Sequence, residues 1–132
     1  MKFFIAQRVT GENRKNLREE CEIVAEILKG TGHACYCTMD EEDSFGAKSR
    51  KEIMEHAFRE IDNCEGLLII MRNENKSEGL LMEVGYILGK KKPIVLCINK
   101  RVKNTYIRDL ADKVIEYKDM KDLHKQLKEL KI

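Results

Sequence analysis

The stretch SEGLLMEVGYILG, residues 77–89, carries a carboxylate inside an otherwise apolar helical pattern. On a helix, Glu83 lies just past the edge of the apolar sector, on the same flank as Gly79 one turn earlier. Ser77 stands where it can cap the helix or offer its hydroxyl, with the free backbone N–H groups, to a phosphate. A ligand over the helix start could come down to the backbone at Gly79 and reach Glu83, which we expect to be half buried. The alternative is an ordinary solvated glutamate, because most glutamates at such an edge face water.

Strand and helix patterns alternate along the chain, as in parallel βαβ units. Apolar runs predict strands at residues 2–7, 33–38, 66–71, 93–99 and 113–117. Helical spacing of apolar residues predicts helices at 13–29, 47–63, 77–89 and 104–110, and from 120 onward. We therefore expect a single domain over residues 1–132, an α/β three-layer sandwich with a five-stranded parallel sheet of the flavodoxin-like or Rossmann-like kind.

In such sheets, ligands bind beyond the carboxyl ends of the strands, near the point where the strand order reverses. The loops expected at this edge are 7–13, 38–46, 72–77 and 99–104. Gln7 and Arg8 open the first of these loops, and the helix that carries Glu83 leaves the third.

Composition limits the classes of partner. Charged residues make up 36% of the 132 residues, but the net charge is only +2, so we expect no broad basic surface for nucleic acid. No apolar stretch approaches a membrane span or a signal sequence, and we expect a cytoplasmic protein without a membrane partner. The five cysteines include no CxxC pair, and we expect them to be buried, reduced thiols. Walker and GxGxxG patterns are absent, and we expect neither a metal site nor a cofactor.

The pattern S-x-G-x-x-x-E-x-G at residues 77–85, followed by the strand PIVL, resembles the signature of the nucleoside 2-deoxyribosyltransferase family and its 2′-deoxynucleoside 5′-phosphate N-hydrolase branch. The resemblance extends over most of the chain, since further segments are similar to parts of the family: KFFIAQRVTGE, IDNCEGLLIIM and RVKNTYIRDLAD.

The resemblance implies cleavage or transfer of the N-glycosidic bond of a nucleoside or nucleotide. Glu83 matches the family's nucleophile, which attacks the anomeric C1′ so that the base departs, before water or a second base completes a double displacement. Ser77 matches a serine that binds the 5′-phosphate, and Arg8 is near an arginine with the same role. Asn104 falls where a neighbouring subunit completes the site, which implies a homodimer or higher homo-oligomer. The catalytic candidate is thus Glu83, and the substrate-binding candidates are Gln7, Arg8, Ser77, Gly79 and Asn104.

Two positions depart from the family pattern. Phe3 or Phe4 replaces a first-strand tyrosine that orients the nucleophile, and Ala57 replaces an aspartate in the second helix. Without a general acid the base leaves less well protonated, a loss of roughly 10²- to 10⁴-fold. The acid could come from the run DEED at 40–43, or less simply from His56. Alternatively, the chain is a catalytically inactive nucleotide-binding or regulatory module on the same fold.

Overall fold

The structure is a computed structural model that describes residues 1–39, 46 and 48–131. The strands are β1 (Lys2–Gln7), β2 (Ala34–Cys37), β3 (Gly66–Met71), β4 (Ile94–Asn99) and β5 (Lys113–Tyr117). The helices are α1 (Arg14–Gly30), α2 (Arg50–Asp62), α3 (Glu78–Gly89), α4 (Ile107–Leu110) and α5 (Met120–Lys128). Each predicted element is present close to its predicted bounds, so the pattern of apolar spacing identified the elements correctly.

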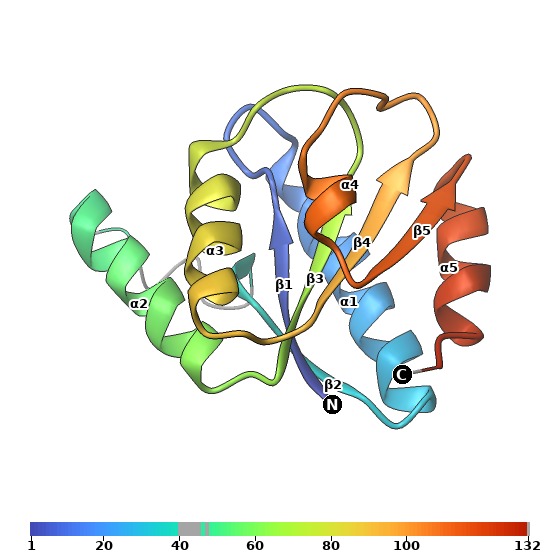
Figure 1. Cartoon of the computed structure of the whole chain (residues 1–132), viewed down its shortest axis with the longest axis horizontal. Coiled ribbons are helices and arrows are strands. Elements are labelled where there is room, and N and C mark those ends of the chain that lie inside the picture. The colour runs from blue at the N-terminus through green and yellow to red at the C-terminus, as the bar shows by residue number, and fades with distance from the viewer. Residues whose placement is uncertain (40–45, 47, 132) are drawn as a thin grey trace.

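The five strands form one parallel sheet in the order β2-β1-β3-β4-β5. Helices α2 and α3 lie on one side of this sheet and α1 and α5 on the other (Figure 1). The predicted three-layer α/β sandwich is therefore confirmed. The strand order reverses between β1 and β3, so the loops that leave these two strands diverge at the carboxyl edge, where ligands of such sheets bind.

Alternation along the strands decides which side chains face each helical layer. In β3, Leu68 and Ile70 pack in the core beneath α1 and α5, whereas Leu67 and Ile69 pack beneath α2 and α3. Both faces are covered, which is why this strand is a continuous apolar run. In β1 the same alternation places Phe3 in the first core and Phe4 in the second. Phe4, and not Phe3, is therefore the aromatic residue on the α3 side.

The helix starts are fixed by side-chain caps. Ser49 and Glu52 form a capping box at the start of α2, with each side chain bound to the other's backbone N–H. This signal was present in the sequence and explains why α2 begins at Arg50 rather than at 47. Within the described residues, no helix has the length and apolar character needed to cross a membrane.

The cysteines differ from the expectation in one respect. Cys21 of α1 and Cys37 of β2 form a disulfide, so the prediction of reduced thiols is wrong for this pair. Helix α1 packs against β2 and brings together two residues that are 16 positions apart, a contact that spacing alone does not reveal. Cys64 and Cys97 are buried thiols, in line with the expectation, whereas Cys35 is outside the disulfide but only partly buried.

Candidate functional site

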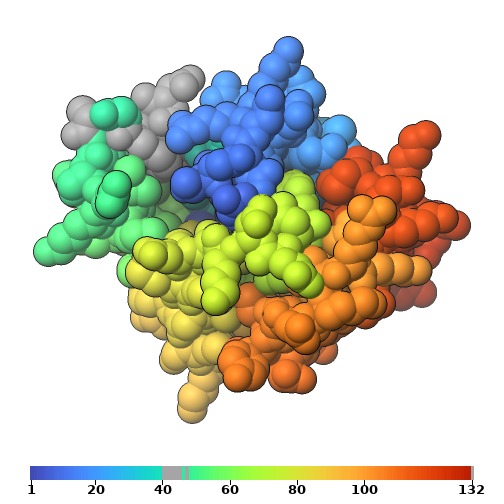
Figure 2. All heavy atoms as spheres, turned by 90° about the horizontal axis from the view of Figure 1, so that it is seen from above, coloured from blue at the N-terminus to red at the C-terminus, as the bar shows by residue number. Residues whose placement is uncertain are grey.

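A cavity of about 760 Å³ opens at the carboxyl edge of the sheet. Its walls come from the β1–α1 loop, the β3–α3 loop with the first turn of α3, and the segment 102–109. Figure 2 looks down on this edge and shows the three segments, blue, yellow-green and orange, side by side. The volume lies within the range of roughly 300 to 1,000 Å³ that is typical of small-molecule sites.

Three of the predicted substrate-binding residues, Arg8, Ser77 and Asn104, line this cavity. Gln7 and Gly79 do not, and neither does the predicted nucleophile Glu83. The structure therefore brings part of the predicted set together from three separate loops and places the remainder beside it.

The loop after β1 is organised by Arg8. Its Nη1 atom forms an ion pair with Glu12 Oε1 at 2.7 Å, and the same oxygen accepts a hydrogen bond from Asn73 Nδ2 at 3.3 Å. Glu12 thus joins the two loops that diverge at the strand-order reversal. Gly11 has φ of +83°, a conformation that favours glycine, and a Cβ there would lie 2.8 Å from Arg8 Nη2 and displace the guanidinium.

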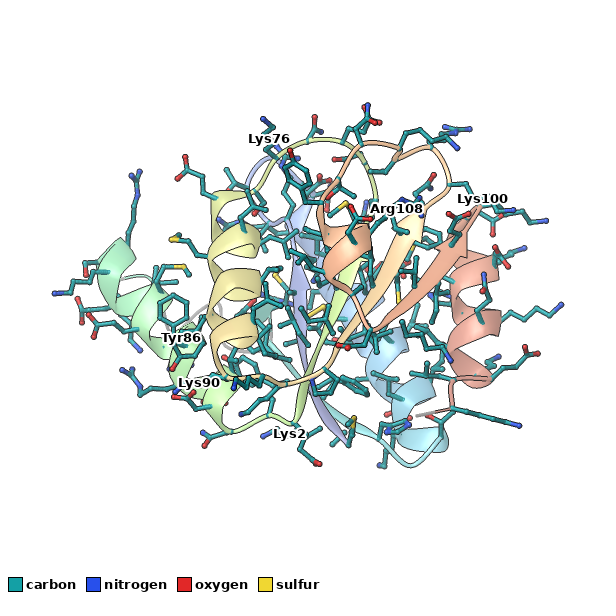
Figure 3. All side chains as sticks on the ribbon, in the orientation of Figure 1. Lys2, Lys76, Tyr86, Lys90, Lys100 and Arg108 are labelled. Atoms are coloured by element: carbon teal, nitrogen blue, oxygen red, sulfur yellow. A yellow bond between two sulfur atoms is a disulfide. The ribbon has the colours of Figure 1, made fainter. Side chains whose placement is uncertain are left out.

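Ser77 is the N-cap of α3. Its Oγ accepts a hydrogen bond from the N–H of Leu80 at 3.2 Å, as the sequence predicted. The hydroxyl proton is not used by this bond and remains available to a ligand in the cavity. Lys76, at the upper end of α3 in Figure 3, lines the same cavity.

The opposite wall is held by Arg108 on α4 (Figure 3). Its Nη2 donates to the carbonyl of Val102 at 3.0 Å, and its Nη1 pairs with Glu116 of β5 at 2.6 Å. These bonds anchor the segment that carries Asn104, which itself is exposed at the cavity rim.

Glu83 is more deeply buried than the sequence predicted. Its side chain is only 9% exposed, and no side chain in the described part of the chain forms a hydrogen bond or ion pair with it. The position one turn before the fully buried Ile87 draws it inward. Burial raises the pKa of Glu83 from 4.5 to about 8, because an isolated charge is poorly solvated there.

The flank of α3 that carries Glu83 faces α2. Tyr86, next on this flank and labelled in Figure 3, stacks on Phe58 of α2 and donates to the carboxylate of Asp62 at 2.9 Å. The cavity lies on the other flank, where Leu81 lines it. Gly79 lies one turn before Glu83 on the same flank, and a Cβ built there meets no atom within 4 Å, so the surface over this glycine is open.

Gln7 is buried at the end of β1 and connects two sets of contacts. Its Nε2 atom lies 3.0 Å from the sulfur of Cys21, and its Oε1 accepts a hydrogen bond from Arg72 Nη1 at 2.8 Å. Arg72 lines the cavity and was not predicted as a site residue. The usable signal was an arginine placed directly after the buried strand GLLIIM, where that strand reaches the carboxyl edge.

Comparison with known proteins identifies the family to which the chain belongs. The family model for nucleoside 2-deoxyribosyltransferase matches residues 9–123. The chain belongs to this family. Membership indicates an activity of the nucleoside deoxyribosyltransferase type. A search of individual curated proteins found no sequence that is significantly similar to this chain.

Solved structures share the fold at low sequence identity. A CMP N-glycosidase from Clostridium botulinum superposes with a TM-score of 0.73 at 16% identity, covering 98% of this chain and 100% of that one. A 2-deoxyribosyltransferase from Bacillus psychrosaccharolyticus gives 0.70 at 18% identity, covering 94% and 90%. A conserved protein from Enterococcus faecalis V583 gives 0.64 at 13%, covering 98% and 99%.

The positions that depart from the family pattern are apolar and enclosed. Phe4 and Ala57 both pack in the core beneath α2 and α3, so neither offers a proton or a hydrogen bond. His56 lies one position before Ala57, and its Nε2 atom is 3.1 Å from the hydroxyl of Tyr36, whose ring packs against Phe4. The acidic run at 40–43 lies outside the described residues.

We looked for metal sites in the described ranges 1–39, 46 and 48–131. No group of three or more histidine, cysteine, aspartate or glutamate side chains there lies close enough together to hold a metal ion.

Proposed function

We propose that this protein cleaves or transfers the N-glycosidic bond of a (deoxy)nucleoside or its 5′-monophosphate through a covalent glycosyl ester on Glu83. The observation that carries the proposal is a buried carboxyl group with no partner in the described residues, on the helix whose start lines the cavity. A structural carboxylate at such a depth is normally paired, so an unpaired one points to a role with a ligand.

The ligand lies across the start of α3 in this proposal. A 5′-phosphate sits in the cavity near Ser77, and the sugar passes over Gly79 to meet Glu83. At a rise of about 1.5 Å per residue, Ser77 and Glu83 are separated by roughly 9 Å along the helix, which suits a molecule with a phosphate at one end and a reacting carbon further along. The open surface at Gly79 supports this path.

The reaction proceeds in two displacements. A carboxylate oxygen of Glu83 bonds to C1′ while the C1′–N bond breaks, and the bonding electrons leave with the base, which takes up a proton. Water or a second base then attacks C1′ and releases the carboxylate. Only ionised Glu83 can start the sequence, and the apolar surroundings that raise its pKa also leave the anion weakly solvated and therefore reactive.

A second candidate is an inactive nucleotide-binding module on the same fold. Phe4 and Ala57 favour it, because the enclosed positions where the resemblance implies an orienting hydroxyl and a general acid carry neither. The two candidates differ in one measurable property, the release of free base.

A homodimer completes the proposed site. Asn104 is exposed at the cavity rim, and large apolar side chains are exposed on α3 and on the 104–110 segment. These side chains are Leu81, Leu88, Tyr106 and Leu110. Exposed apolar groups gathered in this way are typical of interaction surfaces, which supports a partner subunit that contributes Asn104 to its neighbour.

The test incubates the protein with deoxy- and ribonucleosides and their 5′-monophosphates and follows free base. Wild type is expected to release base and Glu83→Ala to release none, whereas Glu78→Ala, an exposed glutamate on the same helix, should behave as wild type. Intact-mass spectrometry on a stalled reaction should show the protein heavier by one sugar moiety. Equal release by wild type and Glu83→Ala would assign the chemistry to another residue, and binding without release by wild type would favour the module.

A further inference from the structure

Arg72 carries a positive charge that forms no ion pair with any of the described residues. It follows β3 at the carboxyl edge and lines the cavity. Its one hydrogen bond in the described part of the chain joins Nη1 to the neutral amide oxygen of Gln7 at 2.8 Å. Its Nη2 atom is buried and has no hydrogen-bond partner there.

Arg8, which lines the same cavity, differs from Arg72 in having an ion-pair partner. Arg8 pairs with Glu12 at 2.7 Å, so its charge is neutralised inside the protein. Glu12 and Glu20 attract Arg72 only from beyond ion-pair distance, and burial is the main influence on its pKa, which it lowers. An arginine stays ionised at neutral pH, so this partly buried charge opposes folding unless something else compensates it.

Gln7 holds the guanidinium in place without neutralising it. The amide of Gln7 is buried and is fixed on its other side by the sulfur of Cys21 at 3.0 Å and that of Cys37 at 4.0 Å. A charged group that is oriented by a neutral partner is already arranged to bind an anion, and it needs no ion pair to be broken first.

We propose that Arg72 binds an oxyanion group of the ligand in this cavity and makes the site selective for a phosphate monoester over the neutral nucleoside. The planar guanidinium fork suits the tetrahedral oxygens of phosphate, and a phosphate in the cavity that Arg72 lines would supply the counter-charge at close range. The identity of the ligand as a nucleoside 5′-monophosphate rests on the proposed function. The anion-binding role of Arg72 does not.

The first experiment measures affinity by calorimetry in a Glu83→Gln background, so that no substrate is consumed. The probes are inorganic phosphate, cytidine and cytidine 5′-monophosphate. We expect Arg72→Gln to weaken binding of both phosphate-bearing probes by about 10- to 100-fold, the range for losing charge-assisted hydrogen bonds, and to leave cytidine binding unchanged. The control Lys100→Gln removes one charge from an exposed side chain that does not line the cavity and should change affinity less than about 3-fold.

The second experiment separates anion binding from a structural role. Removal of an uncompensated buried charge should leave the melting temperature of Arg72→Gln equal to or above that of its parent, and phosphate should no longer raise it. Arg72→Lys keeps the charge without the fork and should show intermediate phosphate affinity, which also decides the matter if Arg72→Gln fails to fold. The proposal is overturned if wild type does not bind phosphate, if Arg72→Gln binds it as its parent does, or if cytidine affinity falls equally. Absence of base release with phosphate binding intact would instead remove only the proposed catalysis.

Discussion

Glu83 illustrates how burial sets chemistry at a single residue. With a pKa of about 8 the carboxyl group is mostly protonated at pH 7, yet a nucleophile must be ionised. We predict that kcat/KM for base release rises about tenfold per pH unit below pH 8 and levels off above it. Initial rates between pH 5.5 and 9.5 measure the profile. A rate that is already constant from pH 5 upward would show that Glu83 is not the group whose ionisation limits the reaction.

The same group links stability to pH. In the unfolded chain Glu83 has its ordinary pKa of 4.5, and in the folded chain its pKa is about 8. Between pH 4.5 and 8 the folded state binds more protons than the unfolded chain, so the free energy of unfolding falls as the pH rises. The stabilisation that the neutral carboxyl group provides is therefore complete below pH 4.5 and is lost as the pH approaches 8. We predict that Glu83→Gln is more stable than wild type at pH 9, by on the order of 1 kcal/mol or more, and that the difference shrinks at pH 5.

Urea denaturation at pH 5, 7 and 9 measures this difference, with Glu78→Gln as the exposed control. A Glu83→Gln variant that is less stable than wild type at pH 9 would mean that the carboxylate has a stabilising partner in solution, contrary to its isolation in the structure.

At the scale of the element, the start of α3 combines two roles that substitution can separate. Ser77 caps the helix through its oxygen, and its hydroxyl proton is free to meet a phosphate. Ser77→Ala should lower the free energy of unfolding by about 0.5–2 kcal/mol. Ser77→Asp keeps a capping oxygen but adds a negative charge, so it should retain stability while phosphate affinity falls. Denaturation and phosphate titration of the two variants distinguish these effects. If both lose stability and keep affinity, the serine serves the helix alone.

The elements themselves were readable from the sequence because each depends on local spacing. The run GLLIIM predicted a covered strand, and the apolar sector of α3 was predicted to contain Leu80, Leu81, Val84, Ile87 and Leu88. Leu80, Val84 and Ile87 are buried, whereas Leu81 and Leu88 are exposed. The position of Glu83 beside that sector was also readable, but its depth was not, since depth depends on how closely α2 and the sheet approach.

Long-range contacts account for what the sequence did not predict. Arg72 and Gln7 are 65 residues apart in the chain and meet only because β1 and β3 are neighbours in the sheet. The disulfide arises in the same way from the packing of α1 on β2. Residue types at one position cannot reveal such pairs, and the choice between Phe3 and Phe4 likewise required knowledge of which helix covers which face.

At the scale of the whole molecule, the cavity is open on the side where the apolar side chains are exposed. Leu81 is 51% exposed and Tyr106 is 87% exposed, and both also line the cavity. In a single chain, the side chain of Tyr106 lines the cavity but buries little of its apolar surface. A second subunit packed on this face would bury both side chains and narrow the cavity, which is the expected behaviour of an isologous dimer.

Leu81→Glu tests the face directly. A charge placed in the centre of an apolar interface is strongly disfavoured, so we predict that this variant sediments as a monomer where wild type sediments as a dimer, with its far-UV circular dichroism unchanged. Ile23→Glu, an exposed apolar residue on α1, should leave the assembly intact.

Mixing two impaired variants tests whether the subunits share a site. If Glu83 of one chain works with Asn104 of the other, a heterodimer of Glu83→Ala and Asn104→Ala contains one site with both residues intact. Random exchange makes about half of the dimers mixed, so about one quarter of all sites should regain wild-type turnover. If each cavity used its own Asn104, every site in the mixture would lack one of the two residues and the activity would equal the mean of the parents. The excess over that mean, measured as base release after subunit exchange, therefore reports a site built from both chains.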